Sequence, residues 1–225
     1  MCGRFSLTWE NWQNVAGKLG LHRDGDVGAC YKAQHNIAPT DSHFIVTTEY
    51  ERRHSQIARW GLVNRRAQDS RQASKCINAR AETIEQHSSY REAFHQRRCV
   101  VPADGLYEWT GPKKDRQPLW IRPSNGELML FAGLYESWHP APDRSECTFT
   151  IVTCAANEMM REIHDRMPVI LDDAGAEDWM NPREEDPMSL KRLLVPAPMA
   201  LLTAEPALLL SSDKSNRPQM LLFEE

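Results

Sequence analysis

The chain has 225 residues, which suffices for one sizeable hydrophobic core and predicts a single domain over residues 1–225. Apolar residues make up 41% and charged residues 26%, as in an ordinary soluble globular protein, and no stretch approaches the roughly 18 apolar residues of a membrane span. The net charge of −4 argues against a protein that coats nucleic acid, and the first residues lack the apolar run of a secretory signal.

Charge is unevenly distributed along the chain. Residues 51–100 hold eleven Lys/Arg and five Asp/Glu, a net of +6, so the remainder sums to −10. A basic segment inside an acidic protein suits one local anion-binding surface. A solvated charged face beside an acidic tail fits the same numbers, and charge alone does not separate the two.

The six cysteines are scattered and none forms a C-x-x-C pair, which disfavours a zinc ribbon or a thioredoxin-type motif. Scattered cysteines in a chain without an export signal are typical of a reducing, intracellular compartment. We therefore expect a cytoplasmic protein.

Hydrophobic spacing predicts the elements of the N-terminal half. Apolar residues at helical spacing predict a helix within Leu7–Leu19, with Thr8 as its N-cap. The alternation in His43–Thr48 and Ser55–Trp60 predicts two strands on either side of a charged turn at Tyr50–Arg53. This half therefore combines a helix with a β-hairpin.

Strands dominate the rest of the chain. Ser89 followed by Glu92 is a capping-box pattern, which predicts a short helix ending near Gln96. Further strands are predicted at Cys99–Ala103, Pro118–Arg122, Leu128–Tyr135, Cys147–Cys154 and Pro168–Leu171. Further helices are predicted at Ala156–Ile163, Ala174–Met180 and Met188–Leu194. Because strands and helices do not alternate regularly, the pattern favours an α+β domain over a doubly wound sheet.

The second residue offers distinctive chemistry. Removal of Met1 would leave Cys2 with an α-amine and a thiol on adjacent carbons. Such an amine condenses with an aldehyde to a Schiff base, and the thiol then closes a five-membered thiazolidine ring. An α-amine has a pKa of about 7.7–8.0, against about 10.4 for a lysine, so a useful share is neutral at pH 7. The plainer alternative is that Cys2 is an arbitrary second residue.

One short segment adds two binding groups. Asn78 and Arg80 lie two residues apart, so they face the same side if the segment is extended. Asn78 can hydrogen-bond a substrate hydroxyl or the N-terminus, and Arg80 can hold a phosphate in two hydrogen bonds. A turn asparagine and a surface arginine are the commoner roles of these residue types.

Two further segments hold proton carriers. Glu108 follows a strand and a Gly turn and lies among aromatic residues, which can raise a carboxyl pKa towards neutrality. His164 precedes a proline-ended turn, and histidine is the most usual proton shuttle. The alternatives are a surface glutamate in a β-turn and a histidine that caps a helix. Asn36–Pro39 indicates a structural turn without a catalytic role.

Taken together, these segments resemble the SRAP proteins (SOS response-associated peptidase; abasic-site processing). The matching motifs follow in order from residue 1 to about 170: Met1-Cys2-Gly3-Arg4-Phe5, Asn36-Ile37-Ala38-Pro39, Trp60-Gly61-Leu62, Asn78-Ala79-Arg80-Ala81-Glu82-Thr83, Arg98-Cys99 through Glu108-Trp109, Ala132-Gly133-Leu134-Tyr135-Glu136, and Ile163-His164-Asp165-Arg166-Met167-Pro168. Each motif is weak alone, but the ordered set is highly specific.

The resemblance implies a single compact α+β domain with a curved, barrel-like, mostly antiparallel sheet and peripheral helices. It implies that Cys2 bonds covalently to the sugar of an abasic site in single-stranded DNA. Asn78, Glu108 and His164 fall on the family's active-site positions.

The resemblance also indicates how the site meets its partner. Arg4, Arg80 and Arg166 look like cleft residues that hold phosphates. The implied partner is single-stranded DNA containing abasic sites. The resemblance implies no membrane partner, no metal and no cofactor. We expect a monomer, associated with the nucleoid if the source is a prokaryote.

The chain departs from the family pattern after Trp60-Gly61-Leu62. The family continues with Ile-Pro and a further Trp, whereas this chain continues with Val63-Asn64-Arg65-Arg66 and has no aromatic residue until Tyr90. A tryptophan at this place would stack on bases, whereas arginines mainly contribute charge, so Arg65 and Arg66 are predicted to hold phosphates. Alternatively, both side chains point to solvent.

Three functions compete at this stage. In the first, Cys2 captures abasic DNA while Glu108 and His164 move protons, with self-removal of Met1 and weak strand cleavage as side activities. The second is an N-terminal-nucleophile hydrolase of peptides or small amides, with the Cys2 thiolate as nucleophile. The third is a DNA-binding module in which Cys2 is incidental. The basic segment favours DNA over a peptide.

Overall fold

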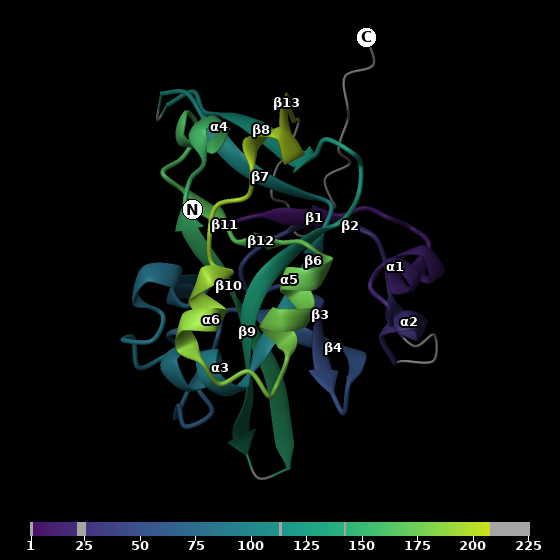
Figure 1. The fold of residues 1–225 in the computed structure, drawn as a ribbon, viewed down its shortest axis with the longest axis vertical. Helices are drawn as coiled ribbons and strands as arrows, with labels where there is room; N and C mark the ends of the chain where they lie inside the picture. Colours follow the sequence, from purple (N-terminus) through teal and green to yellow (C-terminus); the bar gives the residue numbers. More distant parts are fainter. Residues whose placement is uncertain (1, 22–25, 113, 142, 208–225) are drawn as a thin grey trace.

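The computed structural model describes residues 2–21, 26–112, 114–141 and 143–207 (Figure 1). The strands are β1 (Phe5–Leu7), β2 (Gln34–Ile37), β3 (Ser42–Glu49), β4 (Arg52–Trp60), β5 (Asn78–Arg80), β6 (Arg98–Ala103), β7 (Gly105–Thr110), β8 (Gln117–Pro123), β9 (Met129–Ala141), β10 (Arg144–Ala155), β11 (Arg166–Pro168), β12 (Ile170–Leu171) and β13 (Leu202–Pro206). The α-helices are α1 (Trp12–Lys18), α2 (Asp26–Cys30), α3 (Arg91–Gln96), α4 (Glu158–Arg161), α5 (Asp173–Met180) and α6 (Pro187–Arg192). Three 3₁₀ turns are η1 (Ala73–Lys75), η2 (Ala81–Thr83) and η3 (Met199–Leu201).

Five strands close into a small barrel. Around the ring, β10 pairs with β4, β4 with β3, β3 with β6, β6 with β9, and β9 again with β10. Every pairing in this ring is antiparallel except that of β10 with β4. β5 adds to β10 in parallel, while β11 and β12 extend β10 and β9. The ring and its short surrounding helices confirm the α+β, barrel-like prediction.

A second sheet carries the first strand of the chain. Its order is β13–β8–β7–β1–β2, with antiparallel pairing throughout. β1 has only three residues, yet all three are buried. The Phe5 ring meets Trp60 edge-on at 5.1 Å between centroids and Phe131 at 6.1 Å. Phe5 therefore anchors the N-terminus in the barrel core, three residues after Cys2.

The first helix is shorter than its hydrophobic spacing predicts. α1 begins at Trp12, and the Asn11 side chain accepts two helix N–H groups as the N-cap. Leu7 instead ends β1, and the Thr8 hydroxyl donates to Asp104 at 2.6 Å. The prediction of Thr8 as N-cap was wrong because pairing with β7 draws the first residues into a strand.

The predicted capping box is also wrong. α3 begins at Arg91, and Tyr90 stands at its N-cap position without a side-chain hydrogen bond. The Ser89 N–H donates to the His87 ring at 3.3 Å instead. The helix itself ends at Gln96, as predicted.

The other predicted elements are confirmed to within a few residues. β3 and β4 form the predicted hairpin, whose turn residues Tyr50 and Glu51 have φ of 47° and 63°. β6, β8, β9, β10, α5 and α6 match predicted segments, whereas α4 is shorter than predicted and residues 168–171 are divided between β11 and β12. β1, β2, β5, β7, β13 and α2 were not predicted. Over the described ranges, no helix is long and apolar enough to cross a membrane.

Arg98 ties two helix ends to the barrel. Its side chain is buried and donates Nε to the Trp179 carbonyl at 2.7 Å and Nη1 to Phe94 at 2.9 Å. Nη2 donates to the carbonyls of Asn181 and Glu184 at 2.6 and 3.0 Å. Carbonyls at the end of a helix lack partners within the helix, so one guanidinium satisfies groups from both α3 and the end of α5.

We predict that Arg98→Met lowers the free energy of unfolding by at least about 3 kcal/mol, because each carbonyl left buried without a donor costs about 1–3 kcal/mol. Urea denaturation measures this change. Arg71→Met is the control, since Arg71 is 86% exposed and pairs only locally with Asp69, and it should stay within about 0.5 kcal/mol of the wild type. Equal stability of both variants would contradict the assignment of Arg98.

Candidate active site

Cys2 lies inside the fold rather than on its surface. The residue is fully buried, and the Asn78 side-chain amide donates to its backbone carbonyl at 2.8 Å. Asn78 opens β5, which runs parallel to β10 with Asn78 opposite Ile151. The segment is therefore extended, which is the condition under which Asn78 and Arg80 were expected to face the same side, and the structure brings Asn78 and Cys2 together.

The surroundings of β5 hold Asn78 in place. The Tyr90 hydroxyl donates to the backbone carbonyl of Asn78 at 3.2 Å. The ring N–H of Trp60 donates to the carbonyl of Ile77 at 2.8 Å. Within the described residues, the side-chain oxygen of Asn78 is buried and has no hydrogen-bond partner. That oxygen is thus a ready acceptor beside the start of the chain.

Glu108 reaches the same region from the second sheet. It lies on β7, opposite Leu119 of β8, and is 5% exposed, so it is not the surface turn glutamate of the alternative interpretation. The neighbouring Tyr107 N–H donates to the Arg4 carbonyl at 3.0 Å, which couples β7 to the residues that follow Cys2.

The environment of Cys2 favours the protonated form of its thiol. Burial raises its pKa well above the usual range of a thiol, and the nearby Glu108 carboxylate raises it further. A thiolate is the nucleophilic form of cysteine. At neutral pH this environment therefore does not present a preformed thiolate.

His164 lies between α4 and β11 and is partly exposed. Its ring Nδ1 lies 3.0 Å from the Arg166 backbone N–H and 2.8 Å from Asp165 Oδ1. Nδ1 can accept from the N–H in the neutral ring or donate to the carboxylate when protonated. The ring is thus oriented by its own loop, as a proton carrier requires.

Arg4 is positioned by two residues that the sequence did not single out for this purpose. Its Nη1 donates to the Asn36 side-chain oxygen at 2.9 Å, and its guanidinium lies 5.9 Å from the Trp109 ring centroid. Asn36 and Ile37 belong to β2, so the predicted turn begins only after them. Asn36 therefore supports a candidate phosphate-binding residue.

Arg80 and Arg166 flank β10 but differ in their contacts. Arg80 ends β5 and is exposed, opposite Thr153. Arg166 is 13% exposed, forms two hydrogen bonds to the Glu82 carboxylate at 2.6 and 2.9 Å, and donates to the Thr153 carbonyl at 2.6 Å. Arg80 is available to a ligand, whereas Arg166 already braces β10 against η2.

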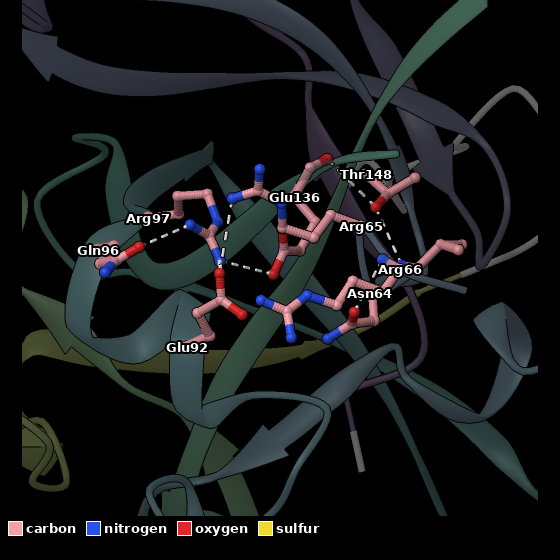
Figure 2. Close-up of polar contacts among 9 residues, drawn as sticks. Asn64, Arg65, Arg66, Glu92, Gln96, Arg97, Glu136 and Thr148 are labelled. Carbon is pink, nitrogen blue, oxygen red and sulfur yellow. Dashed lines mark hydrogen bonds and ion pairs between the residues drawn. The ribbon is translucent and has the colours of Figure 1, made fainter. Parts of the chain in front are cut away.

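Arg65 and Arg66 are exposed in the segment between β4 and β5 (Figure 2). Arg65 Nη1 lies 3.5 Å from Glu92 of α3, so this side chain does not simply point to solvent. The segment is fixed by packing of Val63 against Trp138, whose ring N–H donates to the Ala67 carbonyl at 2.8 Å.

Internal partners neutralise much of the basic segment 51–100. Acidic side chains pair with Arg53, Arg59, Arg65, Arg71 and Arg97. Arg98 is buried against carbonyls. The excess charge of the segment is therefore divided between structural contacts and a few exposed arginines. Among the described residues, no group of three or more His, Cys, Asp or Glu side chains is placed to hold a metal ion.

Comparison with known proteins agrees with this architecture. The family model for SOS response associated peptidase (SRAP) matches residues 1–207. The abasic site processing protein YoqW of Bacillus subtilis is 35% identical over 223 residues, covering 98% of this chain and 99% of the relative. HMCES of Xenopus tropicalis, also named an abasic site processing protein, is 28% identical over 94% of this chain and 69% of its own.

A solved structure shares the fold. The crystal structure of a protein from Bacteroides thetaiotaomicron superposes with a TM-score of 0.82 at 25% sequence identity, covering 91% of each chain. The family match spans all of the described residues, including Cys2, Asn78, Glu108 and His164. The chain therefore belongs to the SRAP family.

Proposed function

We propose that the protein recognises abasic sites in single-stranded DNA and bonds covalently to them through Cys2. The observation that carries this proposal is the environment of the buried Cys2. The Asn78 amide donates a hydrogen bond to its backbone carbonyl, and the charge of Glu108 raises the pKa of its thiol. Relatives named abasic site processing proteins support the same substrate.

The reaction requires that Met1 be removed, because a blocked α-amine cannot form an imine. The amine attacks the aldehyde of the ring-opened sugar, and loss of one water gives a Schiff base. The thiol S–H then adds across the C=N bond, so that sulfur bonds to carbon and the proton passes to nitrogen. The product is a thiazolidine, and the net loss is one water.

The environment of the thiol supports this order of steps. An α-amine with a pKa of about 7.7–8.0 is partly neutral at pH 7, whereas the raised pKa keeps the thiol protonated. The amine therefore attacks first and the thiol follows. The same shift disfavours the competing hydrolase mechanism, which starts from a thiolate.

The surrounding side chains take complementary roles in the proposal. The side-chain oxygen of Asn78, which has no hydrogen-bond partner among the described residues, accepts from the mature N-terminus or from a sugar hydroxyl. Glu108 and His164 move protons as the amine attacks and water leaves. Cleavage of Met1 by the protein itself would use the same groups, and a Schiff base that persists would cut the strand by β-elimination.

In this proposal, arginine side chains supply the contacts to the DNA phosphates. Arg80 is exposed, Arg4 is oriented by Asn36, and Arg65 and Arg66 extend the basic surface. A phosphate at Arg166 has to compete with the Glu82 carboxylate. We place this activity in the cytoplasm and assign it to a monomer, in keeping with the reduced, scattered cysteines.

We expect Cys2→Ala to abolish the heat-stable crosslink to an abasic oligonucleotide, and Cys2→Ser to leave at most a labile one. The reason is that ring closure needs the sulfur. Denaturing gels of purified protein mixed with the oligonucleotide measure the product. Cys30→Ala, at an exposed cysteine, is the matched control and should crosslink normally. A heat-stable adduct of Cys2→Ala would show that another residue performs the chemistry.

Glu108→Gln and His164→Ala should each slow crosslinking by about 10²–10⁴-fold, the usual effect of losing a general acid or base. Single-turnover rates across pH, together with affinity for an intact oligonucleotide, separate chemistry from binding. Glu158→Gln, at an exposed position in α4, serves as a control for a change of charge. Wild-type rates in both test variants at every pH would remove the two residues from the mechanism.

A further inference from the structure

Four charged residues from different elements converge beside the segment between β4 and β5 (Figure 2). Glu92 of α3 accepts from Arg97 at 3.1 Å and lies 3.5 Å from Arg65. Arg97 also reaches Glu136 of β9 at 3.0 Å. The chain of contacts therefore runs Arg65–Glu92–Arg97–Glu136, with two positive and two negative groups.

The inner pair of this chain of contacts, Arg97 and Glu136, is fixed, whereas the outer pair, Arg65 and Glu92, is not. The Glu136 side chain is fully buried and that of Arg97 is 14% exposed, so separating them would leave a charge in the interior. Arg65 is 52% exposed and Glu92 33%. An exposed pair at this distance holds its partners weakly. Arg65 can therefore leave, while Glu92 stays bound to Arg97.

Both outer residues belong to segments that contact Asn78 or lie next to β5. Glu92 follows Tyr90, whose hydroxyl contacts the Asn78 carbonyl. Arg65 lies in the segment from Leu62 to Cys76. The two ends of this segment meet just before β5, because the Leu62 N–H donates to the Cys76 carbonyl at 3.0 Å.

We propose that the Glu92 carboxylate pairs with Arg65 in the DNA-free protein, at the place where a phosphate would bind. A phosphate of the bound strand then displaces Glu92 from Arg65. This inference rests on the proposed binding of single-stranded DNA. The exchange leaves no unpaired charge, because Arg97 retains both Glu92 and Glu136 after Arg65 turns to the DNA. Glu92 thereby acts as a built-in competitor that lowers affinity for single strands.

The Glu92 carboxyl is ionised near neutral pH, so it competes with phosphate for Arg65 under those conditions. The guanidinium of Arg97, and then the charges of Arg66 and Arg65, hold the pKa of the Glu92 carboxyl below its usual range. Glu92 is thus negatively charged whenever the protein is folded near neutrality, and only a competing anion or a substitution relieves it.

The test measures affinity for an oligothymidine that has no abasic site, so that the covalent step does not interfere. Glu92→Gln should bind about two- to fivefold more tightly than wild type at low salt, the scale of a weak exposed ion pair. Arg65→Ala should weaken binding and reduce the log–log salt slope by about 0.7, the effect of one lost phosphate contact. In the double variant Arg65→Ala/Glu92→Gln, the gain from Glu92→Gln should disappear.

Glu10→Gln, the same charge change at an exposed site before α1, controls for a general loss of negative charge and should not reproduce the gain. Wild-type affinity of Glu92→Gln, or a gain that persists without Arg65, would overturn the inference. Crosslinking of wild-type protein to abasic DNA is assayed in parallel. Its absence would refute the proposed function, whereas its presence with an unchanged Glu92→Gln affinity refutes only the role of Glu92.

Discussion

The hydrogen bond from the Asn78 amide to the Cys2 carbonyl fixes the point at which the chain starts inside the fold. Two anchors place Cys2. Phe5 is packed in the barrel core on one side, and β5 holds Asn78 on the other. β5 depends in turn on β10 and on Tyr90. The barrel therefore provides a frame that positions Cys2, the residue at which we propose the reaction.

Electrostatic interactions also set the properties of the Cys2 thiol and of the arginines. Burial and Glu108 keep the Cys2 thiol protonated, so its part in the proposed reaction comes after that of the amine. The arginines differ in how far the fold itself engages them. Arg98 and Arg166 are committed to carbonyls and carboxylates of the fold, whereas Arg80 stays exposed at the end of β5. Arg98 and Arg166 would have to break these contacts before they could offer charge to DNA, whereas Arg80 is exposed.

The sequence predicted the long strands and the site motifs but not their connections. The predicted segments Leu128–Tyr135 and Cys147–Cys154 are apolar runs long enough to be recognised from the sequence, whereas the pairing of β9 with β10 comes from the structure. β1 and β5 have three residues each, too few for a period to appear, so their strand character depends on neighbours distant in sequence. The ion pair of Arg166 with Glu82 joins residues 84 positions apart, and no local pattern indicates it. The sequence motifs therefore identified the candidate site residues. The fold determines which arginines remain exposed and able to contact a ligand.

The most direct test of the central claim is tandem mass spectrometry of the peptide adduct formed with an abasic oligonucleotide. The proposed chemistry predicts that Met1 is absent and that the N-terminal peptide beginning at Cys2 carries the sugar, with a mass equal to both components less one water. Treatment with borohydride should leave this mass unchanged, because a closed thiazolidine has no C=N bond to reduce. A sugar attached to a lysine or to another cysteine, or an adduct on protein that retains Met1, would contradict the account.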